Sequence, residues 1–121
     1  MGADLKIMKK DIPADVWLQQ DEQAVESGYF RDPYNGWSVL WQYGLSWWDD
    51  VSHKLTDEEG TISVENAKKF LRMLEDRQAV FEDNMSKETE EMQKEFRTAS
   101  KLLKKFLWNA IELDSDIATW L

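Results

Sequence analysis

The sequence predicts an all-α fold: a small bundle of about four helices preceded by a short extended N-terminal arm. Three observations support this prediction. Apolar residues recur at helical spacing in three separate stretches, a proline and a glycine bracket a fourth candidate helix, and only one short stretch alternates like a strand. The 121 residues show no repeat or change of composition, so a single helical domain is expected over residues 1–121.

The N-terminal part is expected to contain the arm and the first helix. Residues 4–10 alternate in polarity, which predicts a short strand or extended arm with two apolar residues on one side, Leu5 and Ile7. A first helix is expected from Pro13 to about Ser27, because proline suits the first helical position and Gly28 suits a C-terminal stop. Its narrow apolar face would consist of Trp17, Leu18, Ala24 and Val25.

The next segment, residues 29–36 with the sequence YFRDPYNG, is predicted to be a loop. Pro33 biases Asp32 toward extended geometry, and Asn35-Gly36 is a strong turn signal. Aromatic residues flank this polar turn and are expected to pin it to the body of the protein.

The clearest predicted helix covers residues 37–55. One continuous apolar stripe runs along it, formed by Trp37, Leu40, Trp41, Gly44, Trp47, Trp48, Val51 and Leu55. The favoured role of this stripe is core packing. The alternatives are a partner or homodimer face with aromatic anchors, or a stacking pocket for a flat ligand. Val39 and Tyr43 lie off the stripe, and we expect them to be exposed, with Tyr43 marking an interface.

Two more helices are predicted in the C-terminal half. The first begins after Ser63, a good N-cap, and is expected to break near Asp83, Asn84 and Ser86. The second has its acids Glu88, Glu90 and Glu91 in the first turns and an apolar face that runs from Met92 to Leu113. A short tail is expected to dock after it through Ile117, Trp120 and Leu121.

Composition excludes several classes of function. The chain has no cysteine, which removes disulfides and thiol chemistry. Its net charge of −9 argues against direct nucleic-acid binding, which needs basic residues, and favours a basic partner or plain acidic solubility. No apolar run is long enough for a membrane span or a signal peptide, so we expect a soluble cytoplasmic protein without membrane association.

No catalytic residue, metal site or cofactor is predicted. The segment DEEGTI resembles a calcium loop, but Leu55 and Asn66 occupy the positions where carboxylate ligands are needed. Asp49 and His53 lie four residues apart, yet no second pair of ligands accompanies them, so we expect them to be solvated. Glycine-rich phosphate loops and GxSxG motifs are absent from the sequence. An enzyme built on carboxylates remains an alternative.

The leading hypothesis is a non-enzymatic protein-interaction module with an unknown, basic partner. Its recognition surface would combine three parts: the YFRDPYN segment, Tyr43 on the predicted Trp-rich helix, and the acidic first helix. The segment contributes Tyr29, Phe30, Arg31, Asp32, Tyr34 and Asn35, and the first helix contributes Asp15, Asp21, Glu22 and Glu26. A sharper version is an acidic inhibitor that mimics nucleic acid. The alternative is a small-ligand-binding protein or enzyme with a pocket between the Trp-rich helix and the YFRDPYN loop, touching Arg31 and Trp41 or Trp48.

Two pieces of the chain carry a resemblance. They are the opening Gly2-Ala3-Asp4-Leu5 and the segment GYFRDPYN at residues 28–35, followed by SVLW and LSWW. Together they resemble a group of small bacterial and phage proteins that begin GADL and carry a GYFRD-x-YN turn before a Trp-rich helix. The matching motifs span about a third of the chain. No activity is established for that group, so the resemblance implies a bacterial or phage source and supplies no catalytic residue.

Overall fold

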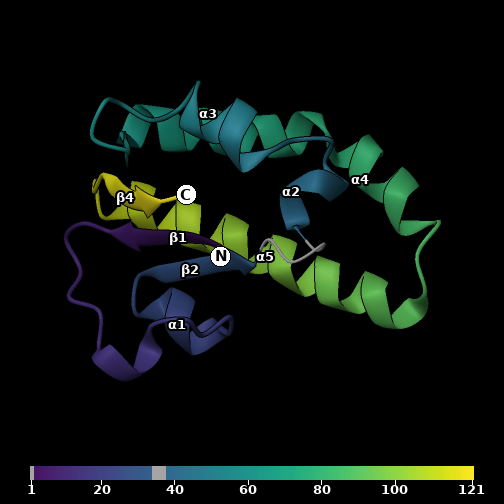
Figure 1. Ribbon diagram of the computed structural model, residues 1–121, viewed down its shortest axis with the longest axis horizontal. Coiled ribbons are helices and arrows are strands. Elements are labelled where there is room, and N and C mark those ends of the chain that lie inside the picture. The colour runs from purple at the N-terminus through teal and green to yellow at the C-terminus, as the bar shows by residue number, and fades with distance from the viewer. Residues whose placement is uncertain (1, 34–37) are drawn as a thin grey trace.

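Within residues 2–33 and 38–121, which the computed structural model describes, the chain folds around a four-stranded antiparallel sheet, so the all-α prediction is wrong. The strand order is β2-β1-β4-β3. The strands are β1 (Gly2–Ile7), β2 (Tyr29–Pro33), β3 (Thr61–Ile62) and β4 (Ile117–Trp120). The first and last strands of the chain, purple and yellow in Figure 1, therefore lie side by side at the centre of the sheet.

The main core lies against one face of the sheet, and a smaller cluster formed by Ile12, Val16, Trp17, Ala24 and Tyr29 lies against the other. Figure 1 shows α3 and α4 following each other along one side of the molecule, α1 on the opposite side below β2, and the long α5 crossing the strands. The helical elements are a 3₁₀ turn η1 (Ala14–Val16), α1 (Glu22–Glu26), α2 (Val39–Gln42), a π-helical segment η2 (Trp47–Ser52), α3 (Val64–Asp76), α4 (Gln78–Met85) and α5 (Glu90–Glu112).

The predicted arm is the strand β1, and its alternation is as expected. Its odd-numbered residues are fully buried in the main core, namely Ala3, Leu5 and Ile7. The all-α prediction left this arm outside any sheet, whereas β2 and β4 pair with its two edges. The predicted loop at residues 29–33 is the strand β2, and the predicted docked tail forms β4.

The first predicted helix is interrupted. Leu18 adopts a left-handed backbone conformation (φ 72°), and its N–H donates to the Tyr29 hydroxyl at 3.1 Å, so residues 14–16 and 22–26 form separate short elements. The Asp21 side chain begins α1 by accepting the Ala24 N–H at 2.9 Å. Gly28, with φ 97°, follows α1 as the predicted stop.

The predicted Trp helix is also two elements, because Gly44 turns the chain between them with φ 71°. Ser46 caps η2 by accepting the Asp49 N–H at 2.9 Å. The break destroys the continuous stripe, since Trp41 and Trp48 are 49% and 62% exposed while their neighbours are buried, namely Leu40, Trp47, Val51 and Leu55. Val39 and Tyr43, expected to be exposed, are fully buried. Trp37 lies outside the described residues.

The C-terminal helices agree better with the sequence. Ser63 caps α3 as predicted, accepting the Asn66 N–H at 3.1 Å. The helix ends at Met85 with Ser86 as its C-cap, so the predicted break near Asp83, Asn84 and Ser86 is confirmed. A further interruption that was not predicted lies at Arg77, between α3 and α4, and the Arg77 guanidinium donates to the carbonyls of Tyr43 and Gly44 at 3.4 and 3.3 Å. The periodic residues of α5 enter the core as predicted, including Phe96, Leu103, Phe106 and Ala110.

Replacing Gly44 with alanine is expected to destabilise the protein by about 1–2 kcal/mol, because an L-residue is strained at this positive φ. Urea unfolding measures the change. Gly44→Asn is the matched control, since asparagine tolerates the left-handed region better although its side chain is larger. If asparagine costs more than alanine, crowding against Arg77, whose Nη1 lies 3.1 Å from an added Cβ, is the cause instead.

Candidate binding groove between β2 and α5

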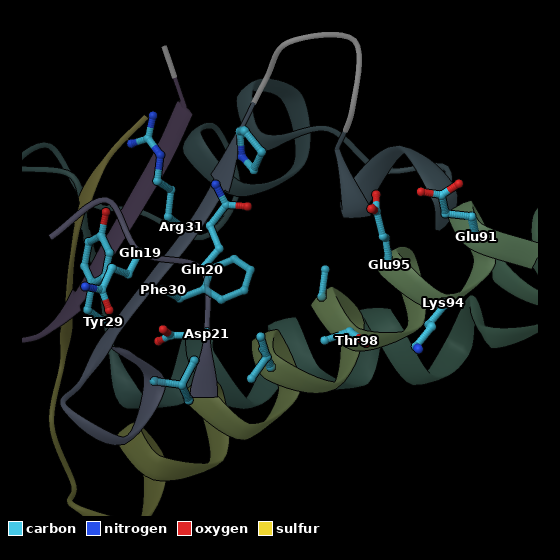
Figure 2. Close-up of a pocket in the computed structure, with 14 residues that line it drawn as sticks. Gln19, Gln20, Asp21, Tyr29, Phe30, Arg31, Glu91, Lys94, Glu95 and Thr98 are labelled. Atoms are coloured by element: carbon cyan, nitrogen blue, oxygen red, sulfur yellow. The ribbon is translucent and has the colours of Figure 1, made fainter. Parts of the chain in front are cut away.

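A groove with a volume of about 600 Å³ lies between β2 and the N-terminal half of α5. Figure 2 shows its two walls, with Phe30 and Arg31 on the strand and Glu91, Glu95 and Thr98 on the helix. The segment leading into α1 closes one end through Gln19, Gln20 and Asp21. Residues 19–33 thus meet a distant part of the chain, residues 91–102 of α5, at one cavity.

The groove has an apolar floor and an acidic rim. The floor consists of Val25, Phe30, Ala99 and Leu102. Three carboxylates lie at the rim, those of Asp21, Glu91 and Glu95, together with the ammonium group of Lys94. Glu91 and Glu95 are exposed, and their side chains make no ion pair or hydrogen bond within the described part of the chain. As far as the described residues go, these two carboxylates can accept hydrogen bonds from a cationic group.

Arg31 lines the groove, but its positive charge is already paired with Asp4. Its Nη1 donates to both carboxylate oxygens of Asp4, at 2.8 and 2.9 Å, and the Tyr29 hydroxyl also donates to that carboxylate. The hydrogen bond to Asp4 raises the pKa of the Arg31 guanidinium, and burial raises the pKa of the Tyr29 phenol. This network holds the Arg31 side chain against β1.

Asp32 points to the opposite face of β2 and is 1% exposed. Its carboxylate accepts hydrogen bonds from the Trp47 indole (2.5 Å), the Ser38 hydroxyl (2.7 Å) and the Val39 N–H (3.4 Å). Burial raises the pKa of this carboxyl, and the three hydrogen bonds oppose the rise. Asp32 therefore ties β2 to the start of α2 and to η2.

The predicted interaction residues are only partly at the surface. Tyr29, Phe30 and Asp32 are buried, and Arg31 is partly exposed at the groove. Tyr34 and Asn35 lie outside the described residues. The expectation that Tyr43 marks an exposed interface is wrong, because its ring packs on Phe81 at 4.6 Å and its hydroxyl bonds to that of Ser100.

The predicted acidic residues are all exposed but do not act together. Lys105 of α5 pairs with Glu22 and Glu26 at 2.9 and 3.4 Å, and its hydrogen bond lowers the pKa of Glu22. Asp21 caps α1 and lines the groove, while Asp15 belongs to η1. The charge of α1 is thus partly neutralised by a neighbouring helix.

Sequence reasoning missed the α5 wall, formed by Glu91, Lys94, Glu95, Thr98, Ala99 and Leu102. A signal was present, because Glu91, Glu95 and Leu102 follow one another at intervals of four and seven along one side of the helix. The expected pocket touched Arg31 and either Trp41 or Trp48. The observed groove does touch Arg31, but α5 forms its other wall and neither tryptophan lines it.

Comparisons with protein-family models, curated proteins and solved structures found no match for this chain. No helix among the described residues combines the length and apolar character needed to cross a bilayer. Those same residues contain no cluster of three or more His, Asp or Glu that could hold a metal ion.

Replacing Asp32 with alanine is expected to lower the free energy of unfolding by about 3 kcal/mol, because three buried donors lose their acceptor. Urea denaturation followed by tryptophan fluorescence measures this loss. Asp15→Ala, at an exposed position, is the control and should change stability by less than about 0.5 kcal/mol. Equal effects of the two substitutions would show that Asp32 does not hold β2 in place.

The ionisation of Asp32 should also make the free energy of unfolding depend on pH. Its pKa in the folded protein is raised above the ordinary value of 3.8, so its favourable contribution is complete below that pH. As the pH rises from 3.8 through the folded-state pKa, this contribution is lost. Over this pH window, the unfolding free energy of wild type should therefore fall relative to that of Asp32→Asn. A relative rise would mean that the hydrogen bonds from the three donors stabilise the charged carboxylate more than burial destabilises it.

Proposed function

We propose that this protein is a non-enzymatic interaction module whose groove between β2 and α5 binds a basic segment of a partner protein. The observation that carries the proposal is the pair of exposed carboxylates without side-chain partners in the described chain, Glu91 and Glu95, at the rim of an apolar floor. A lysine or arginine side chain can place its aliphatic part on such a floor and its charge at the rim.

The charge of the whole chain supports the same kind of partner. A net charge of −9 produces a field that attracts basic proteins and repels nucleic acid. Since exposed carboxylates provide the attraction, binding should weaken as salt is added. We keep a cytoplasmic location and a bacterial or phage source as parts of this proposal.

The proposal differs from an acidic helix that mimics nucleic acid. Such a mimic would use the carboxylates of α1, but Lys105 already pairs with two of them, Glu22 and Glu26. The rim carboxylates that have no side-chain partner among the described residues, Glu91 and Glu95, lie on α5 instead. Recognition by an acidic inhibitor would therefore centre on the groove, with Asp21 as the contribution of the segment before α1.

A small cationic ligand is the second candidate, because about 600 Å³ lies within the range of small-molecule sites. The two candidates differ in what they need beyond the groove. A small ligand is enclosed by the floor and rim alone, whereas a protein segment continues past them and its affinity depends on residues outside the cavity. Competition by free lysine or arginine side-chain analogues distinguishes them.

Neutralising the rim in the double variant Glu91→Gln/Glu95→Gln is expected to abolish capture of the partner while leaving thermal stability nearly unchanged, because both side chains are exposed. Affinity capture from nuclease-treated lysate of the source cells, at low and high ionic strength, measures this.

The matched control is Glu75→Gln/Glu112→Gln, which removes the same charge from exposed positions away from the groove. Wild type and control should retain the same protein in stoichiometric amount, and high salt should release it. A partner retained equally by all three proteins would contradict the proposed site.

A further inference from the structure

We propose that the partner segment binds as an added strand, pairing with the free edge of β2 above α5. This inference rests on the proposed function and specifies its geometry. β2 is an edge strand, because the sheet order β2-β1-β4-β3 leaves it one neighbour among the described strands. Edge strands offer backbone donors and acceptors to a further chain, and several peptide-binding domains use this mode.

The register identifies which backbone groups of β2 face outward. The Ile7 N–H donates to the Gly28 carbonyl at 2.9 Å, which makes these two residues a hydrogen-bonded pair. Such pairs recur at every second residue, so Phe30 and Asp32 also bond to β1. The N–H and C=O groups of Tyr29 and Arg31 consequently point away from β1.

The hydrogen bonds on the other edge of β1 agree with this assignment of the backbone groups that face β1 and those that face away. The Met8 N–H donates to the Asp116 carbonyl at 3.0 Å, so the even-numbered residues of β1 bond to β4. The backbone N–H and C=O groups of the odd-numbered residues of β1 therefore face β2. Outside the β1–β2 ladder, the N–H and C=O of Arg31 make no hydrogen bond within the described part of the chain.

The accessible part of this edge is short and coincides with the groove. Tyr29 is fully buried, whereas Arg31 and Pro33 are partly exposed and line the cavity. Pro33 has no N–H, so the open edge offers the N–H and C=O of Arg31 and the C=O of Pro33. About three hydrogen bonds are available to an added strand. The Arg31 guanidinium is held by Asp4 on another face and does not block the edge.

The floor of the groove lies where the side chains of an added strand would point. A fifth strand would run about 4.8 Å from β2, and alternate side chains would face the same side as Phe30. On that side Ala99 and Leu102 of α5 line the groove and pack against the core cluster that contains Phe30. Figure 2 shows Glu95 on the same helix. The expected partner sequence therefore alternates apolar residues with lysine or arginine.

Synthetic peptides test both the proposed function and its geometry. The probe is a capped peptide of alternating lysine and valine, titrated into wild type and into Glu91→Gln/Glu95→Gln by calorimetry. Two further peptides carry backbone N-methyl groups, one on every valine and one on every lysine. In a strand, these two sets of N–H groups point to opposite edges.

Strand addition predicts that one methylated peptide loses affinity by about tenfold or more, because its pairing edge is blocked, while the other binds like the parent. If both bind like the parent, or both lose affinity equally, strand addition is wrong but the groove proposal stands. If the parent peptide does not bind wild type, or binds the rim variant equally well, the proposed function itself fails.

Hydrogen exchange provides a second readout at the edge. On binding the parent peptide, the Arg31 amide should exchange at least about tenfold more slowly, since it gains a hydrogen bond. The Phe30 and Asp32 amides, already bonded to β1, are internal controls and should not change. An unchanged Arg31 amide in the presence of bound peptide would overturn strand addition.

Discussion

Pairing of both edges of β1 is the constraint on which the rest of the molecule depends. Residues from the first and last parts of the chain become neighbours there, and β2 aligns on the other edge. The alternation of β1 then divides the molecule into two layers. Ala3, Leu5 and Ile7 face the main core under α3 and α5, while Asp4 faces the layer formed by residues 12–29.

The same division gives β2 its two functions in the structure. Asp32 faces the core and holds Trp47 and the start of α2, whereas Arg31 faces Asp4 on the opposite side. Neither side chain is therefore free to bind a partner. The side chains of Arg31 and Asp32 thus serve folding, and in the proposed binding mode the backbone edge of β2 would be the part that recognises the partner.

Local signals were predicted well, and long-range pairing was not. The cap at Ser63, the stop at Gly28, the alternation of β1 and the periodicity of α5 each depend on residues close in sequence. The cap at Asp21 was not predicted, because Asp21 lay inside a longer expected helix. The sheet depends on β1 meeting strands about 25 and 115 residues away, which a pattern within one segment does not contain. The groove was missed for the same reason, since it exists only where β2 lies beside α5.

The position of the groove follows from where the sheet ends. β4 covers the other edge of β1, and α1 covers β2 at Tyr29, so the open edge begins at Arg31. Pro33 then removes a donor, which disfavours pairing between copies of this chain and limits the edge to a short segment. A short backbone edge supplies little affinity alone, and the apolar floor and carboxylates of α5 must supply the remainder. Selectivity for a basic partner would thus come from α5, while β2 would set the partner's direction and register.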